Sequence, residues 1–179
     1  TGTGKTAAFA LPIMQRLGKR RDQGAIRALI LTPTRELALQ IDESLRHYGR
    51  HLSLRSAVVL GGVPSGAQIR ALRQNPDILV ATPGRLLDLM EREAIELGHV
   101  HTLVLDEADK LLDVGFNDEL TVLLDALPVQ RQNLLFSATL PQKVLSLSSR
   151  VLNEPTVLRI DEQHTSVATI EQRVYQVDR

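Results

Sequence analysis

Short apolar runs alternate with segments of helical periodicity along this 179-residue chain. The runs are almost continuously apolar, which is typical of parallel strands that are covered on both faces. Strands that alternate with helices in this way indicate βαβ units around one sheet. The sequence therefore predicts the α/β class, with a mostly parallel sheet and helices on both faces. The predicted strands span residues 28–33, 57–62, 77–82, 102–107, 133–139 and 156–160.

The segments between these strands have the spacing of amphipathic helices. In residues 34–49, four apolar side chains recur on one helical face, and Thr34 precedes them at the position of an N-cap. Those four are Leu37, Ile41, Leu45 and Tyr48. Pro141 suits the first position of the last helix. The predicted helices span residues 5–17, 34–49, 65–74, 84–93, 117–127 and 141–152.

Composition bounds the class of protein. Hydrophobic residues make up 43% and charged residues 23% of the chain, the usual composition of a globular domain. No apolar run reaches the roughly 18 residues that a membrane span needs. The chain has no cysteine, which excludes a disulfide framework and is compatible with a reducing cytoplasm. Its 21 basic residues equal its 21 acidic residues, so any surface that binds nucleic acid must be local.

Residues 1–6, TGTGKT, match the end of a phosphate-binding loop of the pattern G-x-x-x-x-G-K-[ST]. Backbone N–H groups at a helix N-terminus form an anion site, and glycines let a phosphate approach the backbone. Lys5 would reach the β and γ phosphates of a nucleotide, and Thr6 would place its hydroxyl on Mg²⁺. The alternative is a Gly/Thr turn that caps a helix. Because a strand normally precedes such a loop, we expect the sequence to be a fragment that lacks this strand.

Residues 103–109, LVLDEAD, read as an apolar strand that ends in acidic residues. A carboxylate at the carboxyl end of a buried strand, near a phosphate loop, is the Mg²⁺-binding arrangement of NTPases. Asp106 would hold Mg²⁺ through a water molecule, as that ion prefers. Glu107 would then orient or deprotonate the attacking water. The alternative is a helix N-cap followed by an acidic residue in the first turn.

Several motifs together resemble those of the DEAD-box RNA helicases, in the family's order and with similar separations. The sequence DEAD at 106–109 is the signature, and the others are PTRELALQ (33–40), GG (61–62), ATPGRLLDL (81–89) and FSATL (136–140). The resemblance runs from Thr1 to about Ile160 and is bacterial and RhlE-like. It implies a RecA-like P-loop NTPase domain over residues 1–160. Residues 161–179 would be an exit linker toward a second RecA-like domain.

The resemblance implies that the cofactors are ATP and Mg²⁺. Ser137 and Thr139 would couple the ATP site to the RNA-closed state, partly through bonds to Asp109. The residues implied in catalysis are Glu107, Asp106, Lys5, Ser137 and Thr139, and the metal-binding residues are Thr6 and Asp106. The residues implied in ATP binding are Thr1, Gly2, Thr3, Gly4, Lys5, Thr6, Asp106, Glu107 and Asp109.

The resemblance also implies a set of residues that bind the sugar-phosphate backbone of RNA without reading its sequence. An arginine is a bidentate clamp for phosphate, and helix N-termini and glycine backbones allow close phosphate contacts. The alternative for Arg35 is a surface salt bridge with Glu36 or Glu43. The set consists of Pro33, Thr34, Arg35, Gly62, Thr82, Gly84 and Arg85.

The implied function is that of the first domain of a cytoplasmic ATP-dependent RNA helicase, which separates short RNA duplexes locally. The family carries its arginine finger on the second domain, and such a finger contributes about 10³–10⁵ in rate. The chain alone is therefore expected to be inactive. The alternative is a nucleotide-dependent RNA clamp or scaffold without productive unwinding, and a different P-loop class, such as a transporter ATPase or DNA helicase, is a third hypothesis.

Three further features carry no site. The five histidines, at positions 47, 51, 99, 101 and 164, have no metal-binding spacing. The leucines of 111–127 recur at helical spacing and are interpreted as core. Asn75 stands where the family usually has glycine, and asparagine tolerates left-handed backbone nearly as well.

Overall fold

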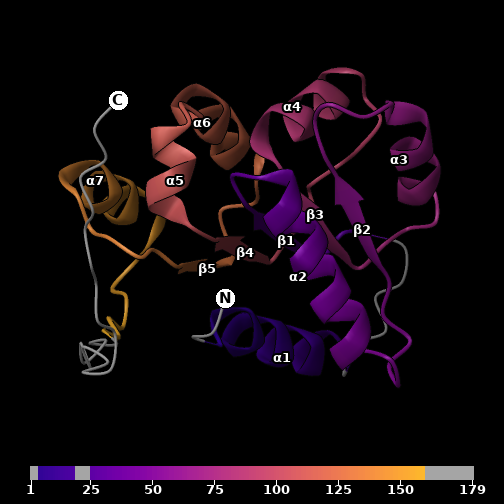
Figure 1. The fold of residues 1–179 in the computed structure, drawn as a ribbon, viewed down its shortest axis with the longest axis horizontal. Coiled ribbons are helices and arrows are strands. Elements are labelled where there is room, and N and C mark those ends of the chain that lie inside the picture. Colours follow the sequence, from indigo (N-terminus) through magenta and orange to yellow (C-terminus); the bar gives the residue numbers. More distant parts are fainter. Residues whose placement is uncertain (1–3, 19–24, 160–179) are drawn as a thin grey trace, which may run out of the picture.

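The computed structural model describes residues 4–18 and 25–159 of the protein. Its five strands form one all-parallel sheet in the order β2-β3-β1-β4-β5, so the predicted α/β class with a parallel sheet is confirmed (Figure 1). The strands are β1 (Ala28–Leu31), β2 (Ser56–Val59), β3 (Ile78–Ala81), β4 (Thr102–Leu105) and β5 (Gln132–Leu135).

Helices cover both faces of this sheet. Figure 1 shows α1 below the sheet and α4, α5 and α6 above it. The first face is covered by α1 (Lys5–Gly18) and α2 (Arg35–Tyr48). The second face is covered by α3 (Ser65–Leu72), α4 (Pro83–Glu91), α5 (Ala108–Asp113), α6 (Asn117–Ala126) and α7 (Gln142–Val151).

Each central strand supplies two cores at once, which is why its sequence is continuously apolar. In β1, Leu29 and Leu31 pack under α3 to α7, whereas Ala28 and Ile30 pack under α1 and α2. All four side chains are fully buried. Successive residues of a strand point to opposite faces, so a strand between two helical layers needs an apolar residue at every position.

Two local predictions about backbone conformation are confirmed. The Thr34 hydroxyl accepts a hydrogen bond from the N–H of Leu37 at 3.2 Å, which makes Thr34 the N-cap of α2. Asn75 adopts a left-handed conformation with φ of 53°, as its place in the family's glycine position indicates.

The strand predicted over residues 156–160 is wrong. Residues 156–159 are irregular and exposed, and residue 160 lies outside the described part of the chain. Within the described residues, no strand pairs with this segment. An apolar run becomes a strand only where a neighbour completes its hydrogen-bond ladder.

Three details of the helices differ from the predictions. The leucines of 111–127 are buried in the core, as predicted, but they are divided between α5 and α6, because Gly115 has φ of +95°, which no α-helix accommodates. Pro141 is the N-cap of α7, one position before the predicted first turn. Tyr48 is 40% exposed, so the predicted apolar face of α2 contributes Leu37, Ile41 and Leu45 to the core but not Tyr48.

Candidate functional site

The polar residues singled out in the sequence gather at one edge of the sheet. In a parallel sheet the carboxyl ends of all strands meet at the same edge, where open α/β sheets bind their ligands. The strand order divides this edge in two: the acidic residues follow β4, with Ser137 and Thr139 after the neighbouring β5, and the candidate RNA-binding residues follow β1, β2 and β3. The segments involved are residues 32–35, 60–63, 82–85, 106–109 and 136–139.

Asp106 and Glu107 form the turn between β4 and α5. Asp106 is only 4% exposed, and its Oδ1 accepts the Glu107 N–H at 3.0 Å. Its own N–H donates to the Leu31 carbonyl at 2.9 Å, which extends the β1–β4 ladder to the acidic turn. Glu107 adopts φ of 51° and ψ of 53°, a left-handed conformation that costs free energy in a residue other than glycine.

Glu107 is the N-cap of α5, whereas the alternative interpretation of this sequence placed the N-cap at Asp106 and a first-turn acid at Glu107. Its carboxylate, however, caps no N–H group of the helix. It forms an ion pair with Lys110, with 3.0 Å between Oε2 and Nζ. Capping therefore does not account for a glutamate at this position.

The pKa of Asp106 depends on charged groups from both nucleotide-binding motifs, the phosphate loop and the acidic turn. Burial raises the pKa of Asp106 to about 6, and the adjacent Glu107 carboxylate adds to this increase. The Glu107 N–H and the positive charges of Lys5 and Lys110 act in the opposite direction. Lys5, at the start of α1, is thus within electrostatic reach of the carboxylate that follows β4.

We expect Asp106→Asn to stabilise the chain at pH 7. The folded-state pKa is higher than the unfolded value of about 3.8, so the folded state binds more protons between these values and loses stability as pH rises through 6. Removing the charge should raise the free energy of unfolding by about 1–3 kcal/mol at pH 7 and leave it nearly unchanged at pH 4. Urea titrations at both pH values would measure this, and a destabilised variant at pH 7 would contradict it.

Asp109 is bonded to the segment that follows β5. Its Oδ2 accepts both the hydroxyl of Thr139 at 2.8 Å and the Thr139 N–H at 3.1 Å. The Ser137 hydroxyl accepts the Asp109 N–H at 3.2 Å and donates to the Thr139 carbonyl at 2.6 Å. Burial acts to raise the pKa of Asp109, but the hydrogen bonds from Thr139 and Ser137 outweigh it and hold the pKa below its usual value.

The other carboxylate oxygen of Asp109 lacks a partner. Its Oδ1 is buried and accepts no hydrogen bond within the described part of the chain. A buried carboxylate oxygen that accepts no hydrogen bond costs free energy. A hydrogen bond to Oδ1 from a donor outside the described residues would remove this cost.

The phosphate-loop residues lie at the start of α1. Gly4 has φ of +70°, and its carbonyl accepts the first helical hydrogen bond, from Ala8 at 3.0 Å. Thr1, Gly2 and Thr3 lie outside the described residues. The rings of Phe9 and Phe136 are in contact, with centroids 5.4 Å apart, and join α1 to the segment after β5. A cavity of about 450 Å³ beside this helix start is lined by Gly4, Thr6, Ala7, Gln40, Glu43, Ser44, His47 and Tyr48.

Arg35 lies against the glycine turn that follows β2. Gly62 has φ of +71°, and a Cβ at this position would lie 2.8 Å from Nη1 of Arg35. The guanidinium therefore rests on backbone that only glycine leaves open. No ion pair among the described residues includes Arg35, so the predicted alternative, a salt bridge to Glu36 or Glu43, does not form.

The turns after β2 and β3 are tied to each other. The Thr82 hydroxyl accepts the Gly61 N–H at 3.3 Å, and Arg85 donates to the Val63 carbonyl at 2.9 Å. Arg85 also pairs with Asp88 at 3.4 Å, so it makes a salt bridge as well. These bonds bring Arg35, Gly62, Thr82 and Arg85 to one part of the edge; Pro33 and Thr34 lead directly into α2, and Gly84 lies in the first turn of α4.

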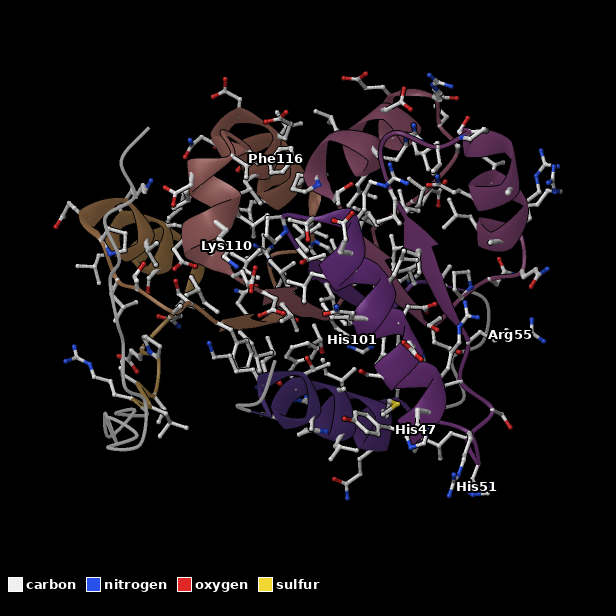
Figure 2. The ribbon with its side chains drawn as sticks, viewed as in Figure 1. His47, His51, Arg55, His101, Lys110 and Phe116 are labelled. Carbon is white, nitrogen blue, oxygen red and sulfur yellow. The ribbon has the colours of Figure 1, made fainter. Side chains whose placement is uncertain are left out.

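Sequence reasoning missed three residues that shape this edge. Gln68 of α3 holds the Leu60 backbone at both ends, accepting its N–H at 2.9 Å and donating to its carbonyl at 3.0 Å. Phe116 lies 3.9 Å from where a Cβ of Gly84 would be, and the third residue is Lys110, the ion-pair partner of Glu107 (Figure 2). Of these three, only Lys110 could have been found from the sequence, because residues three apart on a helix can form an ion pair and Lys110 follows Glu107 at that spacing.

Two exclusions apply to the described residues. No three histidine or carboxylate side chains there are grouped so that they could hold a metal ion by themselves. His164 lies outside the described part of the chain. Mg²⁺ needs no such cage, because it is commonly held by one or two carboxylates and substrate phosphates. In residues 4–18 and 25–159, no helix has the length and apolar character of a membrane span.

A parallel sheet with a phosphate-loop helix and a strand-end carboxylate defines the class of P-loop nucleotide-binding domains. Within that class, residues 1–147 match the family described as DEAD/DEAH box helicase. The chain belongs to this family, and the predicted resemblance is confirmed.

Named relatives support the same assignment. The chain is 41% identical over 177 residues to "DEAD-box ATP-dependent RNA helicase CshA" of Geobacillus kaustophilus, covering 99% of this chain and 38% of the relative. It is 44% identical over 172 residues to "ATP-dependent RNA helicase CshA" of Listeria monocytogenes, covering 96% and 33%. It is 42% identical over 179 residues to "RNA helicase CrhR" of a Synechocystis strain, covering 100% and 36%. None of these three names is RhlE, so that sub-assignment stays a prediction.

The fold also matches a solved structure. A crystal structure of a hypothetical ATP-dependent RNA helicase from Sulfolobus tokodaii superposes with a TM-score of 0.77 and 40% identity, over 86% of this chain and 44% of that one. The RecA-like helicase domain is thereby confirmed as the fold. The chain spans only 33 to 38% of the length of the relatives reported above.

Proposed function

We propose that this chain is the first RecA-like domain of a cytoplasmic ATP-dependent RNA helicase that separates short RNA duplexes locally. The observation that carries the proposal is the division of one sheet edge into an acidic half next to Lys5 and an arginine- and glycine-bearing half. The names of the relatives, all RNA helicases, support it. In this proposal residues 1–160 form the domain, and residues 161–179 lead toward a second RecA-like domain.

The acidic half suits ATP with Mg²⁺. Thr6 and Asp106 would hold the ion, which would neutralise charge that develops on the phosphates. The fit is supported by the raised pKa of Asp106, since a buried carboxylate that two lysines only partly compensate is stabilised in its ionised form by a divalent cation. Residues 1–6 would cradle the phosphates with backbone N–H groups. Glu107 would accept a proton from the attacking water.

The other half suits the sugar-phosphate backbone of RNA. Arg35 is exposed, bears no ion pair among the described residues, and lies on the Gly62 turn. Its guanidinium can bind a phosphate through two N–H groups, and Gly62 leaves room for the RNA strand to approach the protein backbone. Pro33, Thr34, Thr82, Gly84 and Arg85 complete the proposed contact set. All contacts are to the backbone, so binding would be independent of base sequence.

Coupling of the ATP site to the RNA-closed state would use the hydrogen bonds among Asp109, Ser137 and Thr139. They connect Asp109, in the first turn of α5, to the segment that follows β5. The free Oδ1 of Asp109 would accept a donor from the second domain when ATP and RNA close the cleft. Domain closure would therefore be sensed directly at the ATP site.

The proposal is tested by joining the chain to a second RecA-like domain and measuring ATP hydrolysis and duplex separation with and without RNA. We expect RNA-stimulated hydrolysis from the joined protein and negligible turnover from the 179-residue chain, because the arginine finger would be on the second domain. A joined protein that binds ATP and RNA but never hydrolyses ATP would instead be the RNA clamp. RNA-stimulated turnover by the isolated chain would contradict the proposal.

We expect Gly62→Ala to weaken RNA binding severalfold. A methyl group there would displace the Arg35 guanidinium, which lies 2.8 Å from the new Cβ, and would strain the left-handed backbone by roughly 1–2 kcal/mol. The matched control is Gly61→Ala, where nothing lies within 4 Å of a new Cβ. Fluorescence anisotropy with labelled single-stranded RNA would compare the two in the joined protein. Equal affinities of the two variants would refute the contact.

A further inference from the structure

A second cavity opens at the edge of the sheet opposite the proposed ATP and RNA site. It has a volume of about 420 Å³ and lies among the ends of α1, α2 and α3 and the starts of β2 and β3. The β2 ladder separates it from the Gly61–Gly62 turn by about 10 Å. In Figure 2, Arg55 and His51 lie on the far side of the molecule from Lys110 and Phe116.

Of the described residues that line this cavity, three are arginines and none is a carboxylate; the arginines are Arg46, Arg50 and Arg55. Arg46 is paired with the buried Asp42 at 2.7 Å. Arg50 donates to the His51 ring at 3.1 Å and Arg55 to the Gln74 carbonyl at 2.9 Å, and neither takes part in an ion pair between described residues. Two exposed guanidinium charges therefore lack acidic partners in the described structure.

The sequence concentrates positive charge in this region although the whole chain is neutral. From Ser44 to Pro76 there is no aspartate or glutamate, and there are five arginines: Arg46, Arg50, Arg55, Arg70 and Arg73. Charge that is balanced over the chain but segregated on one region favours a partner of the opposite sign.

Apolar side chains also line part of the cavity, which indicates what kind of acidic partner fits. The apolar lining residues are Met14, Leu45, Leu52, Leu54, Pro76 and Ile78, of which Leu52 is 42% exposed. Among the described residues, no aromatic ring lines the cavity, so it offers no surface on which bases could stack. Apolar side chains next to exposed arginines are instead the arrangement of a protein interface with one buried anchor residue.

We propose that this arginine-rimmed pocket is a docking site for an acidic peptide segment of a partner protein, with one large apolar side chain inserted into the pocket. Carboxylates on either side of the anchor would pair with Arg50 and Arg55. The site is separate from the ATP and RNA edge, so a bound partner leaves that edge open. This inference does not depend on the proposed helicase activity.

The test uses the 179-residue chain and a fluorescein-labelled hexapeptide of glutamate and aspartate with one central phenylalanine. We expect saturable binding by fluorescence anisotropy, at least tenfold weaker with Arg50→Glu/Arg55→Glu. A second variant, Leu52→Ala, removes part of the apolar lining and should weaken binding severalfold. The matched control is Arg70→Glu/Arg73→Glu, which changes the same charge in the same acid-free stretch outside the cavity and should leave binding within about twofold.

Three results would overturn the proposal. The first is no binding at a peptide concentration of about 1 mM. The second is an equal loss in both charge-reversal variants, or undiminished binding when alanine replaces the peptide's phenylalanine, since either would mean attraction to net charge alone. The third is binding of a labelled oligouridylate that depends on Arg50 and Arg55 while the peptide does not bind, which would make the pocket an RNA surface. Circular dichroism would verify that every variant is folded.

Discussion

Glu107→Gln should lower the rate of ATP hydrolysis by about 10²–10⁴ while leaving ATP binding nearly intact. The substitution keeps the size of the side chain and removes its ability to accept a proton from water. The left-handed backbone at residue 107 and the turn from β4 into α5 do not depend on the carboxylate, which caps no helical N–H. The loss should therefore appear in kcat, with KM for ATP changed only severalfold. Steady-state hydrolysis by the chain joined to a second RecA-like domain, with RNA present, would measure it.

A matched carboxylate separates this effect from a general loss of charge. Glu96 is exposed, and Glu96→Gln should retain full activity. Lys110→Met is a useful third variant, because it frees Glu107 from its 3.0 Å ion pair without touching the carboxylate. If Glu107→Gln kept more than a tenth of the wild-type kcat, Glu107 would not be the base.

The strands and the functional edge could be predicted because the same physical constraint produces both. A parallel strand between two helical layers must be apolar at each position, so β1, β3 and β4 were visible as uninterrupted runs. Where such a run ends, the chain leaves the sheet at its carboxyl edge and polar residues become possible. Asp106 and Thr82 stand at those ends, and their assembly follows from parallel topology.

The parts that could not be predicted depend on tertiary neighbours. The run over 156–160 resembles a strand, but strand formation requires a partner that its own residues do not encode. Gln68 is an ordinary residue of a polar helix until packing places it beside Leu60, whose N–H and carbonyl it then satisfies. The free Oδ1 of Asp109 is equally invisible, because its environment is set by the loop that carries Ser137 and Thr139, 28 and 30 residues away.

Asp77→Ala should destabilise the domain by about 3–5 kcal/mol, a large fraction of the usual stability of a domain. Asp77 accepts a hydrogen bond from the Arg27 guanidinium at 2.6 Å, and the two side chains are 12% and 4% exposed. Its second oxygen accepts the Arg55 N–H at 2.9 Å, just before β2 begins. Removing the carboxylate would take away the acidic group that compensates the buried Arg27 charge at 2.6 Å, which costs far more than the pair contributes.

An exposed ion pair provides the comparison that makes this prediction sharp. Asp125 and Arg150 lie 3.0 Å apart with side chains 70% and 45% exposed, so Asp125→Ala should change stability by less than about 1 kcal/mol. A double variant, Arg27→Met/Asp77→Leu, should recover most of the loss, because it removes the buried charge together with its partner. Urea unfolding followed by circular dichroism would rank the three variants. If Asp77→Ala and Asp125→Ala destabilised the chain equally, burial would not govern the energetics of this pair.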